Sequence, residues 1–171
     1  MRKQKGFSLI ELLIVVAIIL IIAAIAIPNF LRARMAANDS SAAASLHTIN
    51  IAEAAYFDAY SNVGFPATLV PLGGVSPCTA GIATACLIDN GLALNGGGNG
   101  KSGYGFAATG SASAGSLYND QFYITGTPLS SLTGTRAYCS VEDMVIRLQP
   151  TGNIALIGGY GACQALGPMS P

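Results

Sequence analysis

The chain has 171 residues, which is enough for one ordinary domain and an appendage. Only 9% of the residues are charged and 51% are hydrophobic, whereas about a quarter are charged in a typical soluble domain. The 8 basic and 8 acidic residues balance. Removal of the first six residues would leave five basic residues against eight acidic ones, a net charge near −3. Such a chain has no electrostatic footprint for nucleic acid, so we expect none to bind.

An apolar segment from Phe7 to Ile27 follows three basic residues and is interrupted only by Ser8 and Glu11. As a helix, this segment would span about 31 Å, roughly the thickness of a bilayer core. Because basic flanks stay in the cytoplasm, we expect the N-terminus inside and the rest of the chain outside. The segment is typical of a plain membrane anchor, of a secretory signal peptide cut near Ala26, or of a span with a further role.

Glu11 favours the third interpretation. A carboxylate in an apolar span costs on the order of 2.5–3.5 kcal/mol at mid-membrane, and neither an ordinary signal peptide nor an ordinary anchor has a use for it. If the chain is cut after Gly6, the new α-amino cation at Phe7 lies one helical turn from Glu11. The carboxylate could then pair with its own terminus or with the terminus of a neighbouring subunit, and the second pairing would give it a role in assembly.

The segment around Glu11 also resembles a known family. It reads Gly6-Phe7-Ser8-Leu9-Ile10-Glu11-Leu12-Leu13-Ile14-Val15. Together with the basic leader and the long apolar run, it resembles the prepilin processing segment of type IV pilins and type II secretion pseudopilins. The resemblance implies cleavage after Gly6 by a dedicated membrane peptidase and methylation of the Phe7 amine. It also implies a filament whose core is a bundle of these N-terminal helices.

A helix is predicted to continue beyond the apolar run. Pro28 removes one helical hydrogen bond, so we expect a kink or a local opening there, and the resemblance implies a bend and local melting during assembly. From 29 to 62, alanine is frequent and neither Pro nor Gly interrupts. A stripe near one face predicts that this half packs on a sheet. The stripe consists of Ala42, Leu46, Ile49, Glu53, Tyr56 and Tyr60.

The remainder of the chain is predicted to be rich in strands and loops. The residues from 63 to 66, Val-Gly-Phe-Pro, end the helix, and this aromatic–Pro pair also resembles the helix exit of many pilins and pseudopilins. A loop with a flexible Gly-rich insert is expected from there to Ser116. Four strands are expected, and the last two would form a hairpin about Pro150-Thr151-Gly152. They are Tyr104–Ala108, Gln121–Thr125, Met144–Gln149 and Asn153–Ile157.

The four cysteines favour disulfides over a metal site. None forms a C-x-x-C pair, and the single histidine, His47, lies far upstream, so zinc binding is not expected. An even count in a domain outside the cytoplasm favours two bridges. Of the three connectivities we favour the sequence-local one, Cys78–Cys86 and Cys139–Cys163, each bridge contributing roughly 2–4 kcal/mol. The resemblance implies that the second bridge closes a surface loop that contributes to subunit contacts.

No catalytic, cofactor or metal site is expected. The sequence has one histidine and no obvious pair of carboxylates in a pocket. Gly100-Lys101-Ser102 looks like the end of a P-loop, but position 95 is Asn where that motif needs Gly. The tail after Glu142-Asp143 has no acidic residue, so we do not expect calcium. Major pseudopilins commonly carry a calcium loop and lack disulfides, so this pattern favours a pilin.

These observations predict an α+β fold, in which a long N-terminal helix packs by its second half on a small antiparallel sheet. The expected divisions are a leader at 1–6, a transmembrane and filament-core helix at 7–28, an amphipathic helix half at 29–62 and a β-rich head with disulfide loops at 63–171.

The resemblance implies a non-enzymatic structural subunit of a type IV pilus, assembled through Glu11, Phe7 and Pro28. The alternative is a type II secretion major pseudopilin that forms a periplasmic pseudopilus. The implied partners are copies of the chain, a prepilin peptidase and methyltransferase, and an inner-membrane assembly platform. The chain would begin as a single-pass inner-membrane precursor and end in an extracellular pilus.

Overall fold

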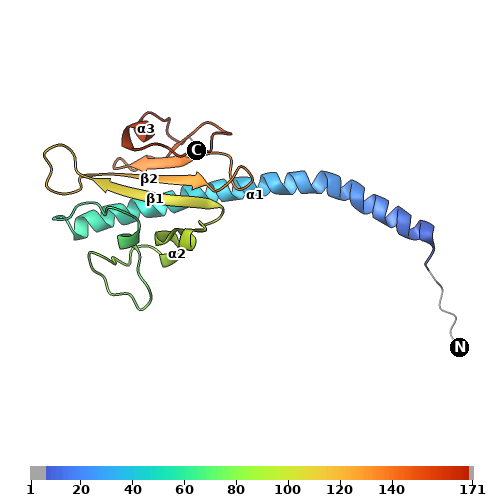
Figure 1. Ribbon diagram of the computed structural model, residues 1–171, viewed down its shortest axis with the longest axis horizontal. Coiled ribbons are helices and arrows are strands. Elements are labelled where there is room, and N and C mark those ends of the chain that lie inside the picture. The colour runs from blue at the N-terminus through green and yellow to red at the C-terminus, as the bar shows by residue number, and fades with distance from the viewer. Residues whose placement is uncertain (1–6, 170–171) are drawn as a thin grey trace. The chain divides into compact units, whose positions relative to one another are not determined.

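A computed structural model describes residues 7–169, so Gly6 and the predicted leader lie outside the described residues. The chain divides into two compact units, the first ending at Arg34 and the second beginning at Met35. Helix α1, Leu9–Ala59, contributes to both units (Figure 1). The first unit therefore consists of helix over its described part from Leu9, and the second holds the sheet and the loops. The α+β class is confirmed.

The helix α1 begins with a partial capping box. Ser8 directly precedes it, and the Ser8 backbone N–H donates to the Glu11 carboxylate at 2.9 Å. A glutamate three residues after the N-cap meets the N-cap N–H in this way and satisfies a donor that has no partner within the helix. Pro28 lies inside α1, and the helix continues through it. Of the kink or local opening expected at this proline, the opening is absent from the described helix, and the kink stays a prediction.

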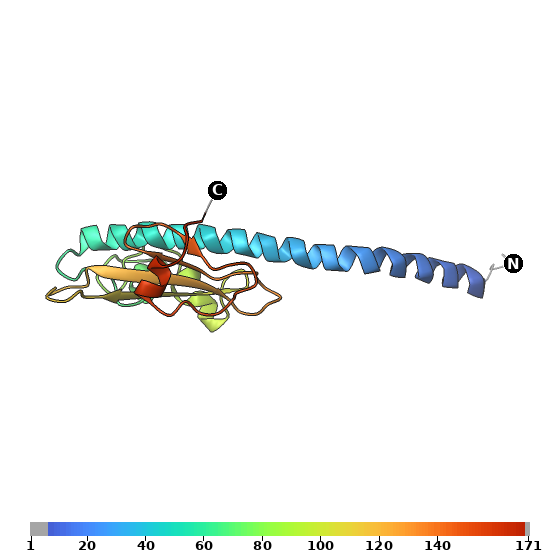
Figure 2. The same ribbon diagram turned by 90° about the horizontal axis from the view of Figure 1, so that it is seen from above.

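The second unit contains one four-stranded antiparallel sheet with the order β1-β2-β3-β4. Its strands are β1 Tyr104–Ser111, β2 Gln121–Pro128, β3 Tyr138–Val141 and β4 Arg147–Leu148. The first two strands were expected, although each extends three residues further. Figure 2 shows the second half of α1 running along one face of this sheet.

The predicted hairpin about Pro150 is wrong. Residues 153–157 form no strand, and β4 pairs with β3, Cys139 lying opposite Arg147. The turn at 150–153 does form, but both of its flanks bond to the segment before β3. The Gln149 N–H donates to the Ala137 carbonyl, and the Ala137 N–H donates to the Asn153 carbonyl. Pairing with a strand that is distant in sequence has replaced the local hairpin.

The predicted stripe on α1 forms the main core of the second unit. Leu46, Ile49 and Tyr56 are at most 1% exposed. They pack with Phe106, Phe122 and other residues of the sheet in one cluster of buried side chains. The interpretation of this half of the helix as a face that packs on a sheet is therefore confirmed. His47 lies on the exposed side of the same helix, as a helix-surface residue would.

A second, smaller core lies around β3. Cys139 and Val141 belong to it, together with Ile157 and Cys163, whereas Tyr138 faces the main core. Helix α3, Tyr160–Gln164, supplies Cys163 to this cluster. Because side chains alternate across a strand, β3 is buried on both faces.

The loop predicted between the helix and the sheet contains short helices. They are η1 Val70–Leu72, α2 Asn90–Ala93 and η2 Asn95–Gly98. The Gly-rich insert was expected to lack packing content, and this expectation is wrong for its first residue. The Asn95 side-chain oxygen accepts the Phe106 N–H at 2.8 Å and so supplies a partner to the outer edge of β1. Glycines at 96 and 97 adopt φ of 59° and 67°, which allows the chain to turn there.

Candidate functional site: the N-terminal segment and the surface of the head

The apolar side chains of the first unit have no cover. Every Leu, Ile and Val side chain between Leu9 and Ile27 is 47–81% exposed. The helix is long and apolar enough to cross a membrane, and none of its most apolar window is buried. Burying one such side chain stabilises by roughly 1.5–3 kcal/mol relative to leaving it in water. This helix therefore needs an apolar surrounding, either lipid or other protein.

Glu11 and Phe7 lie at the start of that helix. Phe7 is 83% exposed. The Glu11 carboxylate accepts the Ser8 N–H, so it is turned back toward the beginning of the chain. Because a carboxylate has two oxygens and about four acceptor sites, this bond leaves capacity for a cation at position 7. The geometry suits a pairing with an amine at Phe7, whether the amine belongs to the same chain or to another.

Two disulfides close loops in the second unit. Cys78 and Cys86 form one, with Cα atoms 6.1 Å apart, and Cys139 and Cys163 form the other, with Cα atoms 5.9 Å apart. This is the sequence-local pairing. Both cysteines of the first bridge are exposed, whereas both cysteines of the second are fully buried. The first bridge therefore fastens a surface loop, and the second fastens α3 and the C-terminal segment to the sheet.

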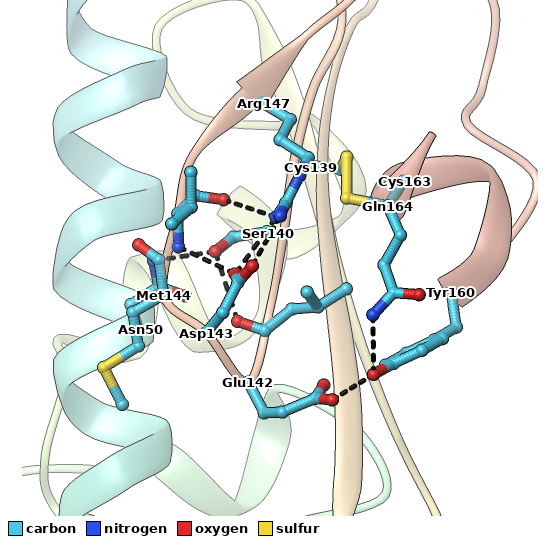
Figure 3. Close-up of polar contacts among 12 residues, drawn as sticks. Asn50, Cys139, Ser140, Glu142, Asp143, Met144, Arg147, Tyr160, Cys163 and Gln164 are labelled. Atoms are coloured by element: carbon cyan, nitrogen blue, oxygen red, sulfur yellow. Dashed lines mark hydrogen bonds and ion pairs between the residues drawn. A yellow bond between two sulfur atoms is a disulfide. The ribbon is translucent and has the colours of Figure 1, made fainter. Parts of the chain in front are cut away.

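A polar network surrounds the second bridge (Figure 3). The buried Asn50 amide donates to the Ser140 hydroxyl at 3.0 Å and to the Met144 carbonyl at 3.2 Å, which ties α1 to β3 and to the turn after it. Arg147 holds Asp143 in that turn, and their hydrogen bond lowers the pKa of the Asp143 carboxyl. Sequence reasoning missed Asn50 because it is polar, although it lies four residues after Leu46 and three before Glu53, which places it on the same face of the helix.

The tyrosine of α3 joins the same region. Its hydroxyl bonds to Glu142 and accepts from the Gln164 amide at 3.0 Å. The bond to Glu142 is the main cause that raises the pKa of Tyr160 to about 12. These contacts bind side chains to one another and hold the C-terminal loop in place. Among residues 7–169, no group of three His, Cys, Asp or Glu side chains is placed to hold a metal ion.

Glu53 is the residue whose environment sequence reasoning did not foresee. It was expected only to fill a gap in the stripe, yet its side chain is 0% exposed and neither carboxylate oxygen has a hydrogen-bond partner in the described chain. Burial raises its pKa to about 8. At neutral pH the folded chain therefore holds Glu53 mainly as the uncharged acid.

Comparison with known proteins agrees with the N-terminal features. A family model described as a prokaryotic N-terminal methylation motif matches residues 1–27. The chain is 49% identical over 74 residues to the type IV wide pilus major component PilA4 of Thermus thermophilus, a match that covers 43% of this chain and 56% of that protein. It is 46% identical over 63 residues to the type IV major pilin protein PilA of Myxococcus xanthus, covering 35% of this chain and 29% of the relative.

No solved structure matches the chain significantly. The matches span 56% and 29% of the lengths of the two relatives, so they leave much of both proteins uncompared. Over the matched lengths the chain is similar to these two type IV pilus proteins, and its first 27 residues match the methylation motif.

Proposed function

We propose that the chain is a structural subunit of a type IV pilus, cut after Gly6 and methylated on the amine of Phe7. The observation that carries this proposal is the uncovered apolar surface of the N-terminal helix. A span of this length first fits the bilayer and can later fit a bundle of identical helices. The methylation motif at 1–27 and the pilus components among its relatives support the same function.

Assembly would replace lipid by protein around each helix. Lipid tails are as apolar as leucine, so the gain comes from close packing and from polar pairing rather than from removal of water. Glu11 supplies the polar pairing, because an amine at Phe7 of a neighbouring copy gives its carboxylate a charged partner. Pro28 would allow the helix to bend or open locally during this transfer.

The chain would follow the divisions expected from the sequence. The leader at 1–6 is removed by a prepilin peptidase that also methylates Phe7, and an inner-membrane platform then extracts the helix. Copies of the chain are the main partners, with the leader cytoplasmic and the head outside. The proposal includes cleavage after Gly6 and assembly through Glu11 and Phe7. It also assigns the loops closed by Cys78–Cys86 and Cys139–Cys163 to the head of the subunit.

Intact-mass spectrometry of the non-reduced chain tests the function, on membranes and on filaments sheared from the cell surface. We expect a mature form that starts at methylated Phe7, is lighter by four thiol protons and is abundant in the sheared fraction. The same mass confined to membranes would point to a type II secretion pseudopilin, the alternative within the family. A mature form beginning after Ala26 would indicate a secreted domain and would overturn the proposal.

A further inference from the structure

Arg136 and Asp58 are among the charged side chains of the described second unit that belong to no ion pair. The ion pairs among residues 7–169 join Lys101 to Asp89 and Arg147 to Asp143, so Arg136 is the one cation of the described head that belongs to no ion pair. Asp58 is exposed and takes part in neither an ion pair nor a side-chain hydrogen bond within the described chain. Arg136 is therefore the cation without an ion pair in the described second unit, and Asp58 is its exposed carboxylate without one.

Arg136 lines a cavity of about 380 Å³. The other lining residues come from α1, from β3 and from the C-terminal segment. They are Ala36, Asp39, Ser40, Ala43, Tyr138 and Met169. The Arg136 Nη2 donates to the Thr151 hydroxyl at 2.7 Å, but the Nε–H is buried and has no acceptor. Swinging the guanidinium into the cavity would break its one hydrogen bond to Thr151 and free a fork of donors that matches a carboxylate.

The carboxylate that already lines the cavity is engaged elsewhere. Asp39 accepts the Tyr104 hydroxyl at 2.6 Å, the Thr135 N–H at 3.1 Å and the Thr135 hydroxyl. These donors hold Asp39 toward the interior of the unit and do not supply a charge. An acid that enters from outside would meet Arg136 as the one cation of the lining, and Arg136 would have to outweigh the negative charge of Asp39 in the same wall.

Asp58 is placed to be that acid in a second copy. Ser40, on the rim of the cavity, and Asp58 are both exposed and lie 18 residues apart on α1. This spacing is five helical turns, so the two side chains lie on the same face, about 27 Å apart along the axis. Between them the face presents Ala44, His47 and Ile51, which leaves no like charge to keep another copy away.

We propose that Asp58 of one copy docks into the Arg136 cavity of the next, as a contact between heads within the proposed filament. The two halves of this contact lie on different parts of the same unit. Such a heterologous contact repeats from copy to copy and builds an open helical assembly unless the rotation closes a ring. The inference rests on the proposed function and adds a contact outside the apolar helices.

A charge swap tests the contact in the full-length chain, produced in a bacterium that has a type IV pilus assembly machinery. Asp58→Arg and Arg136→Asp should each reduce the sheared filament protein by about tenfold, the effect expected for the loss of one charge-assisted contact. The double variant should restore it. Lys101→Glu is the matched reversal of an exposed charge, and it should leave assembly unchanged because exposed ion pairs contribute little.

Cross-linking gives a second measurement that keeps both Asp58 and Arg136. A chain with Ser40→Cys and Ala59→Cys should form a ladder of disulfide-linked oligomers in filaments, and Thr48→Cys with Ala59→Cys should not. Absence of the Ser40 ladder, or single reversals that assemble normally, would overturn the docking. A double reversal no better than the singles, with both native bridges intact, would do the same. If the unchanged chain forms no filament at all, the proposed function fails instead.

Discussion

Glu53 should make the head less stable as the pH rises. Its carboxyl is fully buried without a hydrogen-bond partner in the described chain, and burial raises its pKa from 4.5 to about 8. Between these two values the unfolded chain loses a proton that the folded chain keeps. The free energy of unfolding then falls by about 1.4 kcal/mol per pH unit, or roughly 5 kcal/mol over the interval, and levels off above pH 8.

The variant Glu53→Gln separates this effect from others. It keeps the shape of the side chain and removes the titration, so the slope between pH 4.5 and 8 should disappear. The amide brings one more buried donor than the protonated acid, and without a partner this donor would cost about 1–3 kcal/mol at low pH. The variant should therefore be less stable than the unchanged chain at pH 5 and more stable at pH 8, with the two curves crossing at about pH 5–6.5.

Urea denaturation of the full chain in detergent, followed by near-ultraviolet circular dichroism, measures these curves; tyrosine must report, since the chain has no tryptophan. The other shifted groups titrate outside the window. The pKa values of Asp120 and Asp143 are lowered, and those of the shifted tyrosines are raised above 10. Parallel curves for Glu53→Gln and the unchanged chain from pH 5 to 8 would refute the reasoning.

Three further changes test the assembly segment and the bridges. Glu11→Ala should keep a membrane form that starts at Phe7 but deplete the sheared filament fraction, as measured by immunoblot of both fractions; an unchanged sheared fraction would contradict the role of the carboxylate. Replacing both cysteines of the buried bridge by serine should lower the free energy of unfolding by about 3.5 kcal/mol, and the same change at the exposed bridge should lower it by about 2.5 kcal/mol. These values follow from the lengths of the loops that the bridges close, and the denaturant midpoints of the two variants compare them. Gly74→Ala would place a Cβ 2.0 Å from the Cys78 sulfur, which leaves no room for the Cys78–Cys86 bridge in its present position. Part of the chains should then keep free thiols, which alkylation and mass analysis detect. Gly81→Ala, whose Cβ meets nothing within 4 Å, should detect none.

The N-terminal half could be predicted from sequence because its signals are local. A basic leader, a run of apolar residues and one glutamate identify the segment without any knowledge of what lies far along the chain. The stripe on the second half of α1 was also readable, since helical period depends only on spacing. The capping contact between Ser8 and Glu11 has the spacing of a known motif, and that spacing alone would have indicated it.

The later strands could not be assigned in the same way. Strand β3, Tyr138–Val141, is buried on both faces, so it shows no alternation of apolar and polar residues. Pro150-Thr151-Gly152 is a good turn, and it favours a local hairpin until the competing partner is known. That partner, Ala137, bonds to both sides of the turn from a distance in sequence. Pairing between distant segments is what a local pattern does not contain.

The two units satisfy their apolar residues in different ways, and under the proposed function this difference bears on how one chain could serve as both precursor and polymer. The head buries Leu46, Tyr56 and Phe122 within itself and closes its loops by two bridges, so its fold needs no second copy. The N-terminal helix has no core of its own and takes whatever apolar surrounding is present. A head that is already folded can therefore move from bilayer to filament without unfolding. Contacts between heads, such as the one proposed for Asp58 and Arg136, then use side chains that the folded head leaves exposed, because the residues of the core are already buried.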